Sequence, residues 1–347
     1  PLKCQIASIE KKKEKKNPPL LFNLAELQNE CSKRFKISPD ETLRIVQEMY
    51  EKKLVTYPRT DARVLSTAVA KEIHKNLNGL MKYDPAVPYL QEIVSFGSHK
   101  GLEKTRYVND KQITDHYAII PTGQGLGALK SLSAQGEKVY EVIVRRFLSI
   151  FYPPAVYQKV SVVSGIDKER FFSSFKVLVS EGYFKVTGYS FGKKKEEENQ
   201  KEEEQTADTS LLEVLQSLKK GSILPLEKLT IKEGETSPPK RYTSGSMILA
   251  MENAGQLIED EELRAQIKGS GIGTSATRAE ILKKLVSIQY LALNKKTQVI
   301  TPTLLGEMIF DVVNASIRSL LNPELTASWE KGLTYVAEGS ITSVEYM

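Results

Sequence analysis

The chain has 347 residues, of which 40% are hydrophobic and 27% are charged, and its formal net charge is +6. This composition is ordinary for a soluble globular protein of two or three domains, and no apolar run is long enough for a membrane-spanning helix. The positive charge, with a pI near 9.0, is compatible with nucleic acid as a partner. The two cysteines lack CxxC spacing, so neither a zinc site nor a disulfide framework is predicted, and a reducing cytoplasm is the expected compartment.

The N-terminal segment begins without methionine and without the apolar core of a secretory leader. Residues 1–10 alternate apolar and polar side chains, which predicts a strand and suggests that the chain was cut from a longer protein. The basic run at 11–16 and the following Asn17-Pro18-Pro19 are expected to end this strand. The basic run itself is either a solvated face or a nucleic-acid contact.

From residue 18 to residue 154 the apolar period is mostly helical. Asn23 can cap a first helix, and Ser38 with Glu41 has the spacing of a capping box for a second. This region is predicted to form one mainly helical domain. Its expected elements are two helices within 23–53, a short β-prone piece at 54–57, a helix from 66 to about 80, and a helix over 138–148.

From residue 155 the period switches to two, which predicts a β domain. Because residues 1–10 are also strand-like, we expect them to pair with this region, so that the helical domain is inserted between two parts of one sheet. Residues 193–210 are polar and of low complexity and are expected to be a mobile insertion. The expected strands are 156–162, 171–179, 184–189 and a strand pair within 222–231.

After Pro238-Pro239 the period becomes helical again, which predicts a third, mainly helical domain over 236–347. Its expected helices are 243–254, one that Thr274 or Ser275 caps and that runs through 285, and 304–313.

The segment LVTYPRTDAR at 54–63 carries the first chemical signal. Tyr57 and Arg59 are two residues apart, so in an extended segment their side chains point to the same face. A phenol is a poor nucleophile at neutral pH because its pKa is about 10, but a fixed guanidinium favours the phenolate and binds a phosphate oxygen. The pair could therefore attack a phosphodiester; the alternative is a half-buried tyrosine beside a surface charge.

The second signal is the glycine-rich turn KGSGIGTSATR at 268–278. Its glycines let the backbone approach a ligand closely, and the hydroxyls of Thr274, Ser275 and Thr277 stand at a predicted helix N-terminus, which attracts phosphate. The run is neither a Walker A motif nor a Rossmann fingerprint. It is either a phosphate-binding loop or a structural loop with a helix cap.

The third signal is TDHYAIIPT at 114–122, in which His116 follows an acid. A protonated imidazole could bind a phosphate, and Asp115 would help to hold its charge. The alternative is a histidine with a purely structural role, which is how we interpret His74 and His99.

These three signals occur together in the type IA DNA topoisomerases, which the chain resembles, and the similarity is greatest to the bacterial topoisomerase III subfamily. Two departures from the usual motifs are Ala62, where the family often has serine, and Tyr117, where it often has a second histidine. The matching segments follow the order of the family over nearly the whole chain: LVTYPRTDARVLS, HYAIIPT, VRRFLSIFYPPAVY, KRYTSGSMILAMENAGQLI, GSGIGTSATRAEIL and LTASWEKGL.

The resemblance implies a multi-domain α+β fold, the gate region of a toroidal enzyme. Residues 1–17 and 155–235 would form a β arch, residues 18–154 the helical domain with the nucleophilic tyrosine, and residues 236–347 a helical DNA-binding base domain, truncated at its C-terminus.

It also implies a role for each candidate residue. Tyr57 would attack single-stranded DNA and carry a 5′-phosphotyrosyl link, and Arg59 would position the scissile phosphate. Because this link has nearly the bond energy of the phosphodiester that it replaces, religation would need no ATP, and the enzyme would relax or decatenate DNA. The residues that would contact DNA are His116, Thr122, Lys268, Thr274, Ser275, Thr277 and Arg278.

In this family magnesium is bound by an acidic cluster on an N-terminal Toprim domain, and no DxDxE cluster occurs here. The resemblance therefore implies that Mg²⁺ belongs to a full-length parent, with its ligands upstream of residue 1, and that this chain binds no metal. We expect a monomer, with no membrane association, that binds single-stranded DNA without cleaving it, in the bacterial cytoplasm at the nucleoid.

Two rival interpretations remain. In a non-catalytic module that binds single-stranded nucleic acid, Tyr57 would stack on a base. A tyrosine recombinase or type IB enzyme would need an Arg/His/Lys set around a C-terminal tyrosine, whereas Tyr57 lies near the N-terminus without such a set.

Overall fold

The computed structural model describes residues 3–191, 209–257, 261 and 271–347. The chain divides into two compact units. The predicted domain boundaries near residues 17, 154 and 235 stay a prediction. The sheet unit comprises Pro1–Leu20, Met81–Lys100 and Val144–Pro238, and the tyrosine unit comprises Leu21–Leu80, Gly101–Ile143 and Pro239–Met347.

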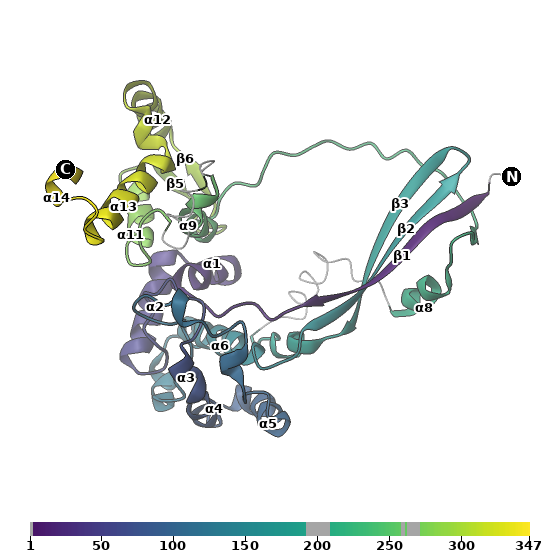
Figure 1. Ribbon diagram of the computed structural model, residues 1–347, viewed down its shortest axis with the longest axis horizontal. Helices are drawn as coiled ribbons and strands as arrows, with labels where there is room; N and C mark the ends of the chain where they lie inside the picture. Colours follow the sequence, from purple (N-terminus) through teal and green to yellow (C-terminus); the bar gives the residue numbers. More distant parts are fainter. Residues whose placement is uncertain (1–2, 192–208, 258–260, 262–270) are drawn as a thin grey trace. The chain divides into compact units, whose positions relative to one another are not determined.

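An antiparallel sheet with the strand order β3-β2-β1-β4 forms the sheet unit (Figure 1). The expected pairing of the N-terminal segment with the later strands is confirmed, because β1 and β2 pair from Cys4 opposite Ile166 to Lys16 opposite Ala155. The strands are β1 (Cys4–Lys16), β2 (Ala155–Ile166), β3 (Glu169–Ser180) and β4 (Ile223–Leu224).

The prediction that the basic run ends the first strand is wrong, because β1 continues through this run to Lys16. An all-charged run shows no apolar alternation, but its backbone pairs with β2 while its side chains extend into solvent. Lys11 also donates hydrogen bonds to the carbonyl oxygens of Gln216 (2.7 Å) and Leu218 (3.1 Å), at the end of helix α8 (Thr209–Ser217).

Two further strand predictions are wrong. Residues 184–189 do not form a strand, because the chain makes the 3₁₀ helix η5 (Gly182–Val186), whose Tyr183 packs on Ala155 and Tyr157 of β2. Aromatic side chains here cover the sheet instead of extending it. The expected strand pair within 222–231 is reduced to the two residues of β4, which pair with Cys4 and Gln5.

The sheet unit is held by a core on one face of the sheet, where Leu215 of α8 packs against Ile6, Val160 and Val162. The unit also contains η1 (Asp84–Ala86) and α5 (Val87–Phe96).

Helices dominate the tyrosine unit, and their N-terminal caps follow the sequence. The side chains of Asn23, Ser38 and Ser66 accept hydrogen bonds from the third backbone N–H beyond them, as cap residues do. The first helices are α1 (Leu24–Phe35), α2 (Pro39–Glu51), α3 (Thr67–Lys71) and α4 (Ile73–Leu80), so the single helix expected over 66–80 is broken at Glu72.

Among the later elements of this unit, α6, α9, α11 and α12 correspond to the expected helices to within a few residues, and the other elements were not predicted. Helix α6 runs on into the residues of the sheet unit. They are η2 (Leu102–Lys104), η3 (Asp110–Gln112), η4 (Leu126–Ser131), α6 (Ala134–Ser149), α9 (Ser244–Glu252), η6 (Ala254–Leu257), α11 (Arg278–Ser287), β5 (Leu291–Leu293), β6 (Ile300–Pro302), α12 (Leu304–Ser316), η7 (Arg318–Leu321), α13 (Pro323–Ala337) and α14 (Ser343–Tyr346).

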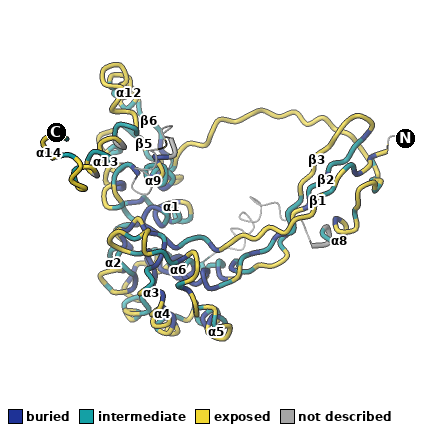
Figure 2. The backbone as a smooth tube through the Cα atoms, viewed as in Figure 1, coloured by how far each residue is buried: buried dark blue, intermediate teal, exposed yellow. Residues whose placement is uncertain are grey.

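Helices α1 and α9 pack closely, and Gly245 makes this approach possible. A Cβ atom at Gly245 would lie 2.7 Å from the Cα atom of Asn29 and 2.7 Å from the Cβ atom of Ser32. A buried hydrogen-bond chain crosses the same contact, from Ser32 to Ser244 (3.2 Å) and from Ser244 to Gln298 (2.7 Å). Many residues are therefore buried where α1 meets α9 (Figure 2).

We predict that Gly245→Ala lowers the free energy of unfolding by about 1–3 kcal/mol, because the added methyl group overpacks the α1–α9 contact. Urea unfolding followed by circular dichroism measures the change. Gly127→Ala is the matched control, since no atom lies within 4 Å of a Cβ placed there. Equal stability of the two variants would show that the α1–α9 contact accommodates the methyl group without cost.

Candidate active site

The tyrosine segment, residues 54–63, has no helix of its own and is held by the segment 116–122. Isolated antiparallel bridges join Val55 to Pro121 and Phe22 to Ile119. The backbone N–H of Thr56 donates to the carbonyl of Ile120 (3.0 Å). The short β-prone piece predicted at 54–57 is thus a bridge rather than a full strand.

Two threonine hydroxyls join these segments, and sequence reasoning missed both. The Thr56 hydroxyl donates to the Ala118 carbonyl (3.0 Å) and accepts from the Ile120 N–H (3.0 Å). The Thr60 hydroxyl donates to the His116 carbonyl (2.8 Å) and accepts from the Ala62 N–H (3.1 Å). The only signal in the sequence was their closeness to Tyr57, because the partners lie far away along the chain.

The structure brings Tyr57 and His116 into direct contact. Their ring centroids are 4.2 Å apart with the planes tilted by 40°, and Tyr50 meets Tyr57 edge-on at 5.4 Å. Tyr57 is half-buried, Pro58 is buried, and Arg59 and His116 are exposed. A phenol, a guanidinium and an imidazole are therefore accessible from solvent on two segments that are hydrogen-bonded to each other.

Thr122 lies in the same group of segments, but its hydroxyl bonds within the protein. It donates to the carbonyl of Lys53 (2.5 Å) and accepts from the N–H of Gln124 (3.0 Å). Its own N–H donates to the Leu54 carbonyl (3.0 Å). Thr122 thus anchors the start of the tyrosine segment, and its predicted contact with DNA stays a prediction.

In the glycine-rich loop, Lys268 lies outside the described residues. The exposed Thr274 and Thr277 close a turn on each other: the N–H of Thr274 donates to the Thr277 hydroxyl (3.0 Å), and the N–H of Thr277 donates to the Thr274 carbonyl (3.0 Å). Helix α11 therefore begins at Arg278, and the prediction that Thr274 or Ser275 caps it is wrong. Ser275, half-exposed, lies within this turn.

Arg278 is 1% exposed and is the largest fully buried side chain among the described residues. Its guanidinium donates to the carbonyls of Ile272 (3.1 Å) and Gly273 (3.0 Å) and pairs with the Asp61 carboxylate (2.9 Å). The loop is fixed on its other side to α9, where the N–H of Ile272 donates to Met251 (2.8 Å). Arg278 therefore connects the glycine-rich loop to the tyrosine segment.

Glu252, at the end of α9, lies beside this ion pair and accepts a hydrogen bond from the Asn23 side chain (2.5 Å). Burial raises the pKa of the Glu252 carboxyl, and the positive charge of Arg278 offsets part of that rise. The group thus holds its proton to a higher pH than an exposed glutamate does.

Among the described ranges, no group of three His, Cys, Asp or Glu side chains could hold a metal ion. None of the helices in the described ranges has the length and hydropathy needed to cross a membrane.

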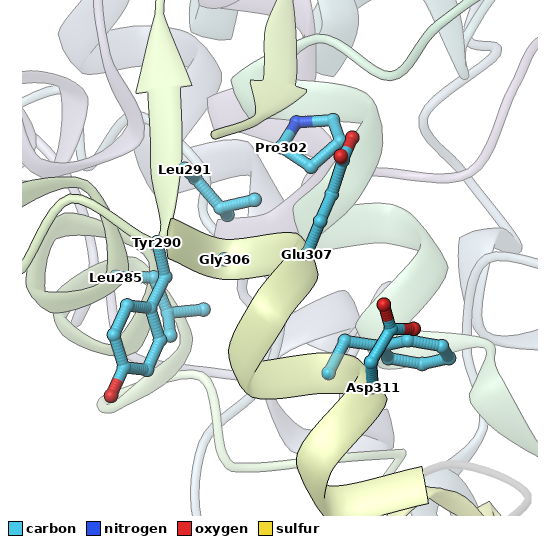
Figure 3. A pocket seen from close by; sticks show the side chains of 8 residues that line it. Leu285, Tyr290, Leu291, Pro302, Gly306, Glu307 and Asp311 are labelled. Atoms are coloured by element: carbon cyan, nitrogen blue, oxygen red, sulfur yellow. The ribbon is translucent and has the colours of Figure 1, made fainter. Parts of the chain in front are cut away.

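A pocket of about 540 Å³ lies between α11, β5, β6 and α12 (Figure 3). None of the predicted site residues lines it. Its walls carry two acids, Glu307 and Asp311, which would repel a phosphate, so the pocket is unsuited to nucleic acid. The lining residues are Leu285, Tyr290, Leu291, Pro302, Gly306, Glu307, Phe310 and Asp311.

A sequence model of the DNA topoisomerase family matches residues 2–347. The chain belongs to this family. It is 36% identical over 348 residues to DNA topoisomerase 3 of Bacillus subtilis strain 168, covering 99% of this chain and 45% of that protein. It is 35% identical to DNA topoisomerase 3 of Bacillus licheniformis, again over 99% of this chain and 45% of the relative.

The fold is shared with the full-length topoisomerase I of Thermotoga maritima, with a TM-score of 0.67 at 22% identity over 98% of this chain and 50% of that one. The mixed helix and sheet architecture predicted for a type IA topoisomerase is therefore confirmed. The chain spans less than half the length of the two Bacillus relatives.

We predict that Glu252→Gln makes the protein more stable than wild type at pH 7.5 and leaves it nearly unchanged at pH 4. The folded pKa of Glu252 is raised above its unfolded value of 4.5, so the folded state binds more protons and wild-type stability falls as pH rises above that value. Gln keeps an acceptor for Asn23 and carries no charge.

Urea unfolding at pH 4, 5.5 and 7.5 measures the difference, and the exposed Glu280→Gln is the control. A less stable Glu252→Gln at pH 7.5 would mean that the attraction between Glu252 and Arg278 outweighs the cost of burial.

Proposed function

We propose that this chain carries the nucleophile of a type IA DNA topoisomerase. The Tyr57 oxygen attacks a phosphodiester of single-stranded DNA, a bond forms between that oxygen and phosphorus, and the bond to the 3′-oxygen breaks. The phenol loses its proton and the departing 3′-oxygen gains one. The 5′-phosphotyrosyl link then returns to the 3′-hydroxyl after strand passage, so relaxation or decatenation needs no ATP.

The observation that carries this proposal is the contact of Tyr57 with His116 at 4.2 Å, beside the exposed Arg59. The transferring phosphoryl group is negatively charged, and fixed donors around it contribute most of the rate enhancement in such reactions. Arg59 is suited to this task, because within the described ranges no acid neutralises its guanidinium and a planar fork can bind two phosphate oxygens. His116 can donate a further hydrogen bond to the same phosphate or to its neighbour.

The strand leading to Tyr57 is proposed to bind at the turn of Thr274, Ser275 and Thr277, whose side chains are exposed or half-exposed. Lys268 would add charge to this contact. Single-stranded DNA fits an attack by a side chain on an irregular segment, because the backbone of an unpaired strand is free to bend toward it. We also propose that the protein is a monomer and works in the bacterial cytoplasm at the nucleoid.

Magnesium is proposed as a cofactor of the full-length protein. Since the described residues offer no metal-binding group, we expect this chain alone to bind single-stranded DNA without cleaving it.

The alternative is a non-catalytic module in which Tyr57, Tyr50 and His116 form an aromatic platform for an unpaired base. The observation that favours this alternative is that the Tyr57 ring contacts Tyr50 at 5.4 Å and His116 at 4.2 Å.

We predict that Tyr57→Phe in the full-length gene product abolishes the covalent DNA adduct and changes the affinity for a single-stranded oligonucleotide by less than about threefold. Phe keeps the ring contacts but removes the attacking oxygen. Denaturing gels of a 5′-labelled and a 3′-labelled oligonucleotide measure the adduct and show which DNA end is attached.

Tyr50→Phe is the matched control, because it removes a hydroxyl from the ring that packs against Tyr57 and should leave the adduct intact. Normal relaxation of supercoiled DNA by Tyr57→Phe would establish the stacking module instead.

A further inference from the structure

We propose that Arg278 acts on the reaction through Asp61, as a positioning residue that sets the distance between the glycine-rich loop and the nucleophile, and does not bind DNA itself. This inference rests on the proposed function of Tyr57. It assigns to Arg278 a role different from the DNA contact that the resemblance implied.

The burial of Arg278 argues against direct contact with DNA. The side chain is 1% exposed, and three of its N–H groups are directed at Ile272, Gly273 and Asp61. A buried guanidinium is tolerated only where its charge and donors are matched, and here internal acceptors match them. A phosphate could reach this group only by displacing Asp61 or the loop carbonyls.

Asp61 connects the ion pair to the reactive residues. It follows Arg59 by two positions, and its own carbonyl accepts a hydrogen bond from the Asn23 side chain (3.1 Å). The preceding residue is held equally well, because the Thr60 carbonyl accepts from the Leu24 N–H (3.1 Å). Because the backbone of Thr60 and Asp61 is hydrogen-bonded in this way, a displacement of the Asp61 carboxylate is transmitted along the chain to Arg59 and Tyr57.

The other member of the ion pair, Arg278, holds the two carbonyls that come just before the turn proposed to bind the DNA backbone. Ile272 and Gly273 immediately precede Thr274, and Gly271 adopts a positive φ of 63°. A Cβ atom at Gly271 would lie 2.3 Å from the Met251 carbonyl oxygen, so the loop is seated on α9. Arg278 thus joins two DNA-contacting parts of the site, each of which is anchored separately.

Such a coupling sets which phosphate along a bound strand meets Tyr57. If the link is cut, each part should still bind DNA, but the scissile phosphate is no longer held in line with the phenol oxygen. Misplacement of a reacting group by about 1 Å can cost on the order of 100-fold in rate. The signature of a positioning residue is therefore a slow reaction with nearly normal affinity.

The test uses the full-length gene product with a labelled single-stranded oligonucleotide in magnesium-containing buffer. It compares wild type with Asp61→Ala, Asp61→Asn, Arg278→Lys and the Asp61→Ala/Arg278→Lys double variant. Two quantities are measured for each protein: the single-turnover rate of Tyr57 adduct formation and the dissociation constant for the oligonucleotide. Thermal unfolding reports the folded fraction, to which each rate is normalised.

We expect Asp61→Ala and Arg278→Lys to slow adduct formation by about 10- to 100-fold, with a dissociation constant within about threefold of wild type. Asp61→Asn should recover part of the rate, because its amide oxygen can accept the same N–H. The double variant should be no slower than the slower single variant, since both changes break one link.

The inference is overturned if Arg278→Lys weakens oligonucleotide binding while Asp61→Ala binds and reacts as wild type does, because Arg278 would then be a direct DNA ligand. It is also overturned if only the unfolding temperature changes. Should Arg278→Lys fail to fold, the half-exposed Asp61 decides alone, since Asp61→Ala removes the link from the outer side. A wild-type protein that forms no Tyr57 adduct would refute the proposed function instead.

Discussion

The structure of the site depends on the hydrogen bonds that an irregular segment must find outside itself. Residues 54–63 have no helix or strand in which to pair their backbone groups, and unpaired polar groups cannot remain buried without cost. The segment 116–122 supplies backbone partners for Leu54 and Thr56, and its Ala118 and His116 carbonyls accept the hydroxyls of Thr56 and Thr60. These bonds also bring the imidazole of His116 against the ring of Tyr57.

Burial alternates along the tyrosine segment in a way that separates support from chemistry. Leu54 and Val55 are buried and Pro58 is buried, whereas Arg59 is exposed beside the half-buried Tyr57. Arg59 and Arg278 show how burial decides what one residue type can do. An exposed guanidinium is available to an incoming phosphate, whereas a buried one bonded to Asp61 and two carbonyls is already occupied.

The elements that could be predicted from sequence are those whose signals are local. The caps at Asn23, Ser38 and Ser66 lie within three residues of the N–H groups that they accept from, and the helices that they begin appear where expected. The continuation of β1 through its basic run could not be predicted, because a run of charged residues has no alternation of apolar and polar side chains. Pairing with β2 determines it instead. In the candidate site, the motifs singled out Tyr57 and His116, which the structure brings into contact. The hydrogen bonds of the Thr56 and Thr60 hydroxyls could not be predicted, because the carbonyls that they reach lie more than 50 positions away.

The role of Arg278 was hidden for the same reason, since Asp61 is 217 positions away in the chain. An arginine in a motif with small hydroxyl residues at a helix start is typical of phosphate binding, and only its burial distinguishes the alternative. A planar guanidinium is suited to a positioning role, because its N–H groups point in fixed directions and hold three acceptors in one arrangement. A lysine would keep the charge but not the angles. An apolar pair could fill the same volume but would let the loop and the tyrosine segment slide past each other. A defined spacing between the proposed nucleophile, Tyr57, and the turn proposed to bind the DNA backbone would account for a buried charge where packing alone would have been enough for stability.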